Sequence, residues 1–319
     1  MKPGARLMLV GDKNQLSSVE PGHVLGDICR ARTSEGYSEK TCSLVREVSG
    51  YELTHTPVST LEDCIIELRK SYRFSRSSGI GLLADAVQEG DSLKGLELIR
   101  NKAYEDVVFK DLQETEPVRD LLSQSVQEGF HGFLKARSVL ERFEYFARYR
   151  VLCALRKGPF GVESVNRAIE KLLKAQGLID PGLHHYHGRP VLITANDYSL
   201  KLFNGDVGIV LIDDEDGELK CFFPAKAGGI RKVSPARLPA HETAFAMTVH
   251  KSQGSEFSSV LLILAAKDSR VLCRELLYTG ITRAMDRLVV ASSPAVFSSA
   301  VTRRTERSSG LGELLDIRG

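Results

Sequence analysis

The sequence predicts an α/β protein with a small antiparallel β module inserted into it. Apolar runs typical of buried strands, such as residues 150–155 and 260–265, alternate with segments of helical periodicity, such as Val162–Ala175. From residue 188 to about residue 239 the pattern changes to short strands separated by turns. These strands are expected at residues 190–194, 208–212, 219–223 and 230–233. Such spacing is typical of a small antiparallel barrel.

The composition is that of an ordinary soluble globular protein. A length of 319 residues, with 42% hydrophobic and 26% charged residues, is enough for about two domains. We expect no membrane span, and the first residues lack the apolar run of a secretory signal, so a cytoplasmic protein is expected. The net charge of +2 is too small to indicate a nucleic-acid-binding protein by itself. Any DNA contact must come from local basic stretches, at residues 69–76, 226–237 or 303–307.

Cysteines and histidines do not predict a metal site. The six cysteines are scattered without a C-x-x-C pair, and they are expected to be reduced. His184, His185 and His187 crowd one loop, but neither a cysteine nor a carboxylate stands at ligand spacing nearby. We therefore expect an exposed loop there, with no bound metal.

The stretch from Thr248 to Phe257 concentrates hydroxyl, imidazole, ammonium, amide and carboxylate groups between two apolar runs. Residues 244–249 and 260–265 are predicted to be strands, and only a tight turn is expected between them. Gly254 can close such a turn, or it can let the backbone approach a phosphate. Ligands of open α/β sheets bind beyond the carboxyl ends of strands, where this turn is expected. The pattern indicates a functional site rather than a core.

Two other stretches carry candidate functional groups. Gln15 follows an apolar run at residues 7–10, so it is expected at the carboxyl end of a strand. Arg283 ends a predicted helix at residues 274–284, and it shares one helical face with Thr279. On the residues alone, Arg283 is either an exposed solubilising side chain or an arginine that reaches a phosphoryl group across an interface.

These stretches resemble the later motifs of superfamily 1 helicases, and more narrowly the RecD subunits of exodeoxyribonuclease V. The sequence holds GDKNQLSSVEPG, then LRKSYRF at residues 68–74, then TVHKSQGSEF, then LLYTGITRA at residues 276–284. Their order is that of the family, and the resemblance covers essentially the whole chain. It implies the end of a first RecA-like domain at residues 1–105 and the start of a second at 106–187. An inserted SH3-like β module at 188–240 and the remainder of the second domain at 241–319 would follow.

The chain also departs from the family pattern. A helicase motor needs a phosphate-binding G-x-x-x-x-G-K-[ST] loop and an acidic metal-positioning motif, which precede GDxxQL in the family. Neither pattern occurs in this sequence. We therefore expect the isolated chain to lack ATPase activity, and we expect the residues that position Mg²⁺ to lie in a preceding part of the protein.

The resemblance implies roles for side chains around ATP and Mg²⁺. Gln15 would sense the terminal phosphate, and Arg73 and Arg283 would hold that phosphate during transfer. Tyr72 would lie beside the base. Without the family context, Arg73 and Tyr72 would be expected at the start of a surface helix.

The central stretch would contact both nucleotide and DNA in this resemblance. Glu256 would meet the ribose, and Gly254 would allow its close approach. Thr248, His250 and Ser252 are the candidates for contact with the DNA backbone. A single segment would then couple the two binding sites.

The function implied is 5′-to-3′ translocation along single-stranded DNA, driven by ATP. In the family, this subunit works with RecB and RecC on duplex DNA ends in double-strand break repair and recombination. No nuclease carboxylate cluster is apparent, so cutting would belong to a partner. Two alternatives remain open: a non-catalytic DNA- or protein-binding module that uses the inserted barrel, and a standalone RecD-like helicase.

Overall fold

A computed structural model describes most of the chain, and it divides the chain into two compact units. The described residues are 4–16, 24–30, 32, 35–58, 60–68, 77–101, 104–113, 117–182, 184–225, 228–305 and 311. One unit comprises Met1–Tyr72 with Thr305–Gly319, and the other comprises Arg73–Arg304. This division differs from the expected boundary at residue 105, because residues 77–101 belong to the larger unit.

The smaller unit is helical in its described part. It contains α1 (Val24–Arg30), α2 (Glu39–Ser49) and α3 (Thr60–Asp63). Ser38 caps α2 through the backbone N–H of Thr41, and the Asp63 carboxylate accepts hydrogen bonds from both residues. These hydrogen bonds hold the pKa of Asp63 below its ordinary value.

The strand predicted at residues 7–10 is not formed. These residues have no strand conformation, and all four are more than half exposed. A strand needs a neighbouring strand for its backbone hydrogen bonds, and none of the described segments pairs with this one. An apolar pattern does not by itself supply that partner.

The larger unit is built on a parallel sheet of five strands, which confirms the predicted α/β class. The strand order is β1 (Val107–Asp111), β10 (Ala284–Ser292), β9 (Phe257–Ile263), β2 (Tyr149–Cys153) and β8 (Ala246–Thr248). Every pair of neighbours is parallel. The expected strands at residues 150–155 and 260–265 correspond to β2 and β9, whereas β1 was not predicted.

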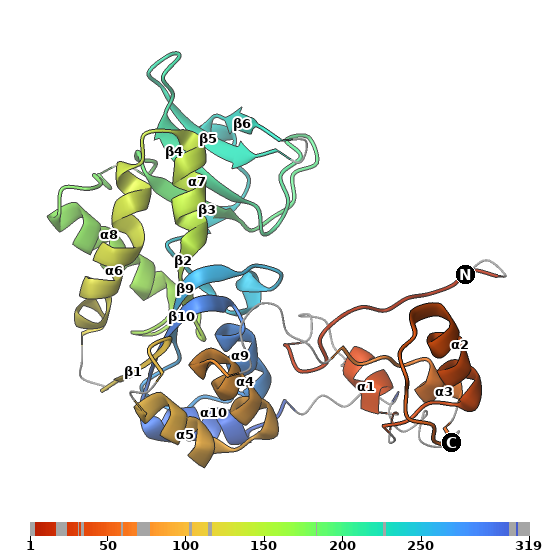
Figure 1. Cartoon of the computed structure of the whole chain (residues 1–319). Helices are drawn as coiled ribbons and strands as arrows, with labels where there is room; N and C mark the ends of the chain where they lie inside the picture. Colours follow the sequence, from red (N-terminus) through yellow and green to blue (C-terminus); the bar gives the residue numbers. More distant parts are fainter. Residues whose placement is uncertain are drawn as a thin grey trace. The chain divides into compact units, whose positions relative to one another are not determined.

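Helices cover both faces of this sheet (Figure 1). One layer contains α6 (Val118–Lys135), α7 (Val139–Arg148) and α8 (Val162–Ala175), and the other contains α4 (Gly79–Glu89), α5 (Ser92–Arg100), α9 (Arg274–Ile281) and α10 (Pro294–Thr302). Val151 and Cys153 of β2 pack toward the first layer, where burial raises the pKa of the Cys153 thiol. Leu262 of β9 points to the second layer, against Gly280 of α9. This alternation explains why the central strands are apolar throughout.

The predicted β module is present as a second sheet, with antiparallel strands. Its order is β6 (Ile230–Val233), β5 (Leu219–Pro224), β4 (Val207–Ile212), β3 (Arg189–Ile193) and β7 (His241–Thr243). It has a small core of its own, which includes Val191, Leu202 and Phe223. In the described part of the chain, no pairing joins the edge strands β6 and β7, so a closed barrel stays a prediction.

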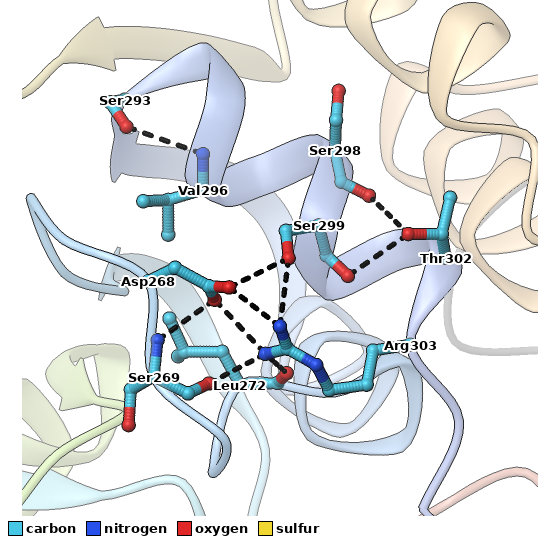
Figure 2. A network of polar contacts seen from close by, with 9 residues as sticks. All are labelled: Asp268, Ser269, Leu272, Ser293, Val296, Ser298, Ser299, Thr302 and Arg303. Carbon is cyan, nitrogen blue, oxygen red and sulfur yellow. Dashed lines mark hydrogen bonds and ion pairs between the residues drawn. The ribbon is translucent and has the colours of Figure 1, made fainter.

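A polar network fixes the last helix of the larger unit (Figure 2). The Arg303 guanidinium donates to both oxygens of Asp268, at 3.0 and 2.6 Å, and to the carbonyl oxygens of Ser269 and Leu272. It also donates to the Ser299 hydroxyl, at 3.0 Å. Arg303 thereby joins the end of α10 to the loop that follows β9, and it holds the pKa of Asp268 down at about 2. None of the described helices combines the length and the apolar character needed to cross a membrane.

Candidate functional site

The segment from Thr248 to Phe257 runs from the carboxyl end of the parallel sheet back to its amino end, where each end is named after the strand termini that lie there. Thr248 ends β8 opposite Cys153, at the carboxyl end, where β2 and β9 also terminate. Phe257 begins β9 opposite Ala284, at the amino end, where β10 begins. The predicted tight turn is therefore wrong: β8 and β9 are parallel and separated by β2, so the chain must return along the sheet before β9 can start. The segment does so through the short 3₁₀-helix His250–Ser252.

The first half of this segment lies at the carboxyl end, as expected for a ligand-binding position. Thr248 and His250 are partly exposed there. The Thr248 hydroxyl accepts a hydrogen bond from the Lys251 N–H at 3.3 Å. Ser252, in contrast, is fully buried, and its hydroxyl donates to the Val249 carbonyl at 2.7 Å. Ser252 thus stabilises the 3₁₀ turn, and its contact with DNA stays a prediction.

The second half of the segment lies at the amino end of β9, whereas the prediction placed it beyond the carboxyl end of a strand. Gly254 has a φ of +82°, a left-handed conformation that other residues adopt only with strain. A β-carbon built at Gly254 would meet no atom within 4 Å, so a ligand can approach the backbone there. Glu256 is exposed two residues later. The contact of Glu256 and Gly254 with a ribose stays a prediction.

Arg283 is buried against this turn. It is only 2% exposed, its Nη1 donates to the Ser255 carbonyl at 2.9 Å, and its Nε donates to the Thr279 carbonyl at 3.1 Å. The Phe257 N–H donates in turn to the Arg283 carbonyl at 2.9 Å. The Arg283 guanidinium therefore holds the turn between Gly254 and Glu256 instead of projecting from the surface, and its role at a phosphate stays a prediction.

A second buried arginine, which sequence reasoning missed, contacts the residue at the end of the segment and the chain that leads into β8. Arg150 donates to the carbonyl oxygens of Ala244, at 2.9 Å, and Phe146, at 3.1 Å. Its guanidinium carbon lies 3.7 Å from the Phe146 ring centroid and 5.0 Å from that of Phe257. Complete burial lowers the pKa of Arg150 to about 9, which leaves it charged at neutral pH. The available signal was an arginine at the start of an otherwise apolar strand.

Asn166 of α8 holds the connection between the two sheets. Its side-chain amide donates to the Thr243 and Ala246 carbonyls at 2.9 and 3.0 Å, and it accepts from the Ala246 N–H at 2.8 Å. Thr243 ends β7 of the antiparallel sheet and Ala246 begins β8 of the parallel sheet. One buried amide therefore fixes the point where the chain passes from one sheet to the other.

The antiparallel sheet also contacts the central segment. The Lys251 ammonium donates to the Asn204 side chain at 2.6 Å, and Asn204 lies in the turn before β4. Beside it, the rings of Phe203 and Tyr198 pack edge to face, with centroids 6.0 Å apart, and Tyr198 is 77% exposed.

The remaining predicted residues belong to other parts of the chain. Gln15 belongs to the smaller unit, where its amide donates to the Asp12 carboxylate at 3.0 Å. Tyr72 and Arg73 lie outside the described residues. Their roles around the nucleotide stay predictions.

Comparison with known proteins places this geometry in a class. The family described as the UvrD-like helicase C-terminal domain matches residues 243–291, which include the central segment and Arg283. Residues 243–291 of the α/β unit are thus of the class of helicase C-terminal domains. The Pif1 helicase structure from Bacteroides aligns with 79% of this chain at 18% identity, but its TM-score of 0.40 is too low to define a shared fold.

The sequence relatives narrow the class. The RecBCD enzyme subunit RecD of Haemophilus influenzae is 35% identical over 99% of this chain, and that of Mycobacterium tuberculosis is 37% identical over the whole of it. The ATP-dependent RecD2 DNA helicase of Deinococcus radiodurans is 28% identical over 95% of the chain. This chain belongs to the RecD helicase family. It spans 51%, 50% and 35% of the lengths of these three relatives, respectively.

Proposed function

We propose that this chain supplies the second motor domain of a RecD-type, ATP-dependent 5′-to-3′ DNA helicase. One observation carries the proposal: a single segment, Thr248 to Phe257, joins the carboxyl end of the parallel sheet to its amino end, and Arg283 holds it at the amino end. A motor must couple a nucleotide site to a DNA site. A rigid segment with an open glycine at one end and exposed hydroxyl and imidazole groups at the other is suited to that task.

The proposed contacts with the nucleotide involve residues at the amino end of the parallel sheet. Glu256 would bind the ribose, and Gly254 would admit it. Arg283 would act on the terminal phosphate of ATP once the turn that it holds is displaced, and Gln15, Tyr72 and Arg73 would complete the site. When bound, Mg²⁺ would neutralise phosphate charge, and the residues that position it are expected outside this chain.

The proposed contacts with DNA involve residues at the carboxyl end of the parallel sheet. Thr248 and His250 would bind the backbone of single-stranded DNA. As part of the intact subunit, the chain would act on duplex DNA ends in the cytoplasm together with RecB and RecC.

The test compares ATP turnover with DNA binding for the purified chain. We expect no ATP hydrolysis with or without single-stranded DNA, and binding of a fluorescent single-stranded oligonucleotide that weakens in Thr248→Val and His250→Ala. Robust ATP turnover that Arg283→Ala abolishes, in a variant with an unchanged circular dichroism spectrum, would contradict the half-motor assignment.

A non-catalytic binding module is the second candidate, and the exposed Tyr198 next to Phe203 favours it. Aromatic side chains on an exposed turn can stack on bases. This function predicts that Tyr198→Ala weakens oligonucleotide binding, whereas His250→Ala and Arg283→Ala leave it unchanged. Co-purification with RecB and RecC separates the RecD subunit from a standalone RecD-like helicase.

A further inference from the structure

Three histidines meet where the antiparallel sheet begins and ends in the chain. His184 and His185 precede β3, and His241 begins β7, the strand that pairs with β3. One ring nitrogen from each histidine lies within 4.8 Å of the others. The sequence predicted only an exposed loop here, because His241 comes from the far end of the sheet and was not part of the pattern. The third histidine of that loop, His187, is not in the cluster.

His241 presents an unused lone pair to its surroundings. Its Nδ1 lies 2.7 Å from the Pro239 carbonyl oxygen, which can only accept a hydrogen bond, so Nδ1 carries the proton. Nε2 is then an acceptor, and it is buried without a hydrogen-bond partner. Leaving a buried acceptor unpaired is costly. A histidine that binds a metal through one nitrogen commonly donates the other N–H to a backbone carbonyl, as His241 does here.

We propose that His184, His185 and His241 form a binding site for a divalent first-row transition metal ion, which we infer to be Zn²⁺. Three imidazoles leave one position open for water in a tetrahedral site, and imidazole nitrogens suit zinc. Bonds of about 2.0–2.1 Å place ligand nitrogens roughly 3.3 Å apart, so the rings must move closer by up to about 1.5 Å. His184 is exposed, so it can make most of that movement.

The Arg189 guanidinium contacts the cluster, so a bound cation must compete with its positive charge. Arg189 donates to the His184 carbonyl at 2.6 Å and to the Thr243 hydroxyl at 3.1 Å, and its Nη1 lies 3.3 Å from His185 Nδ1. The last contact is the longest of the three, and a metal would replace it. Burial lowers the pKa of Arg189, and the nearby Tyr186 and Glu170 oppose that shift.

Metal binding would join the start of the antiparallel sheet to its end. His241 is paired with Ile193 of β3, so an ion held with His184 and His185 adds a side-chain link to the backbone link that exists. Closing the chain across this sheet stabilises it against unfolding by restricting the unfolded chain. The site is separate from the central segment, so the inference does not depend on the helicase assignment.

The experiment titrates the tag-free, EDTA-treated chain with Zn²⁺ by calorimetry and with Co²⁺ by visible absorption. We expect one ion per chain, a tetrahedral Co²⁺ spectrum and an increase in thermal unfolding temperature with zinc. Affinity should fall at least about tenfold in His184→Ala and in His241→Ala. His187→Ala is the matched control, because the His187 ring lies outside the cluster and its Nδ1 accepts from the Ile212 N–H.

Other outcomes would overturn the proposal. These are the absence of binding at zinc concentrations equal to that of the protein, a zinc affinity that His184→Ala leaves unchanged, or an equal loss of affinity in His187→Ala. His184 is exposed, so its replacement should leave the fold intact even where His241→Ala does not.

Discussion

Replacing Arg303 with alanine should destabilise the larger unit measurably, because this one side chain holds the end of α10 to the loop after β9. The guanidinium makes five hydrogen bonds, two to the Asp268 carboxylate, two to backbone carbonyls and one to the Ser299 hydroxyl. The backbone bond from the Arg274 N–H to the Arg303 carbonyl, at 2.8 Å, is unaffected by the substitution. The variant therefore tests the side-chain network by itself.

The magnitude follows from the exposure of the partners. The side chains of Arg303 and Asp268 are 32% and 46% exposed, so solvent screens their ion pair to about 0.5–1 kcal/mol. The carbonyls of Ser269 and Leu272 regain water when the guanidinium is removed, which leaves about 0.5–1 kcal/mol for each lost bond. The sum is a loss of about 2 kcal/mol in the free energy of unfolding.

Urea denaturation followed by far-ultraviolet circular dichroism measures this loss. Arg304→Ala is the matched control, because it removes the same charge from the next residue, which is exposed. We expect the control to change the unfolding free energy by less than about 0.5 kcal/mol. If Arg303→Ala and Arg304→Ala unfold at the same urea concentration, the network does not stabilise the fold and the reasoning is refuted.

Three further predictions concern pH, the glycine turn and the buried arginine. The pKa of Asp268 is about 2 in the folded chain against an ordinary 3.8, so its contribution to the unfolding free energy is complete above about pH 4 and is lost as pH falls through 2. The stability of wild type should therefore approach that of Asp268→Asn as pH falls from 4 toward 2, and a constant difference between the two would contradict this. Gly254 and Gly177 both have positive φ and open space around them, so Gly254→Ala and Gly177→Ala should each lower the unfolding free energy by about 1 kcal/mol in urea denaturation. Only Gly254→Ala should weaken nucleotide binding by the intact subunit, and equal effects on binding would refute the role of Gly254. Arg150→Met should leave the unfolding free energy within about 1 kcal/mol of wild type, because removing a buried charge offsets the lost hydrogen bonds. It should nevertheless speed hydrogen exchange at residues 244–257. Unchanged exchange would show that Arg150 does not position the segment.

Local patterns determined most of the secondary structure of this protein. The helix expected at Val162–Ala175 is α8 with the same bounds, and four strands of the antiparallel sheet, β3 to β6, lie within a residue or two of their expected positions. The fifth strand, β7, was not predicted. Periodicity and turn residues are properties of neighbouring positions, so the sequence shows them directly. The order of the four motifs is also a property of the sequence alone, and it correctly indicated the helicase family.

Pairing between distant segments was decided only by the tertiary structure. Residues 7–10 have the composition of a strand, but no described segment pairs with them, whereas residues 248–257 form a crossover because β2 lies between β8 and β9. Burial of charge was also hidden, since Arg150 and Arg283 are enclosed by groups far away in sequence. The histidine cluster has the same origin: His241 reaches His184 and His185 only because β7 pairs with β3, and no local pattern records a contact that the fold creates.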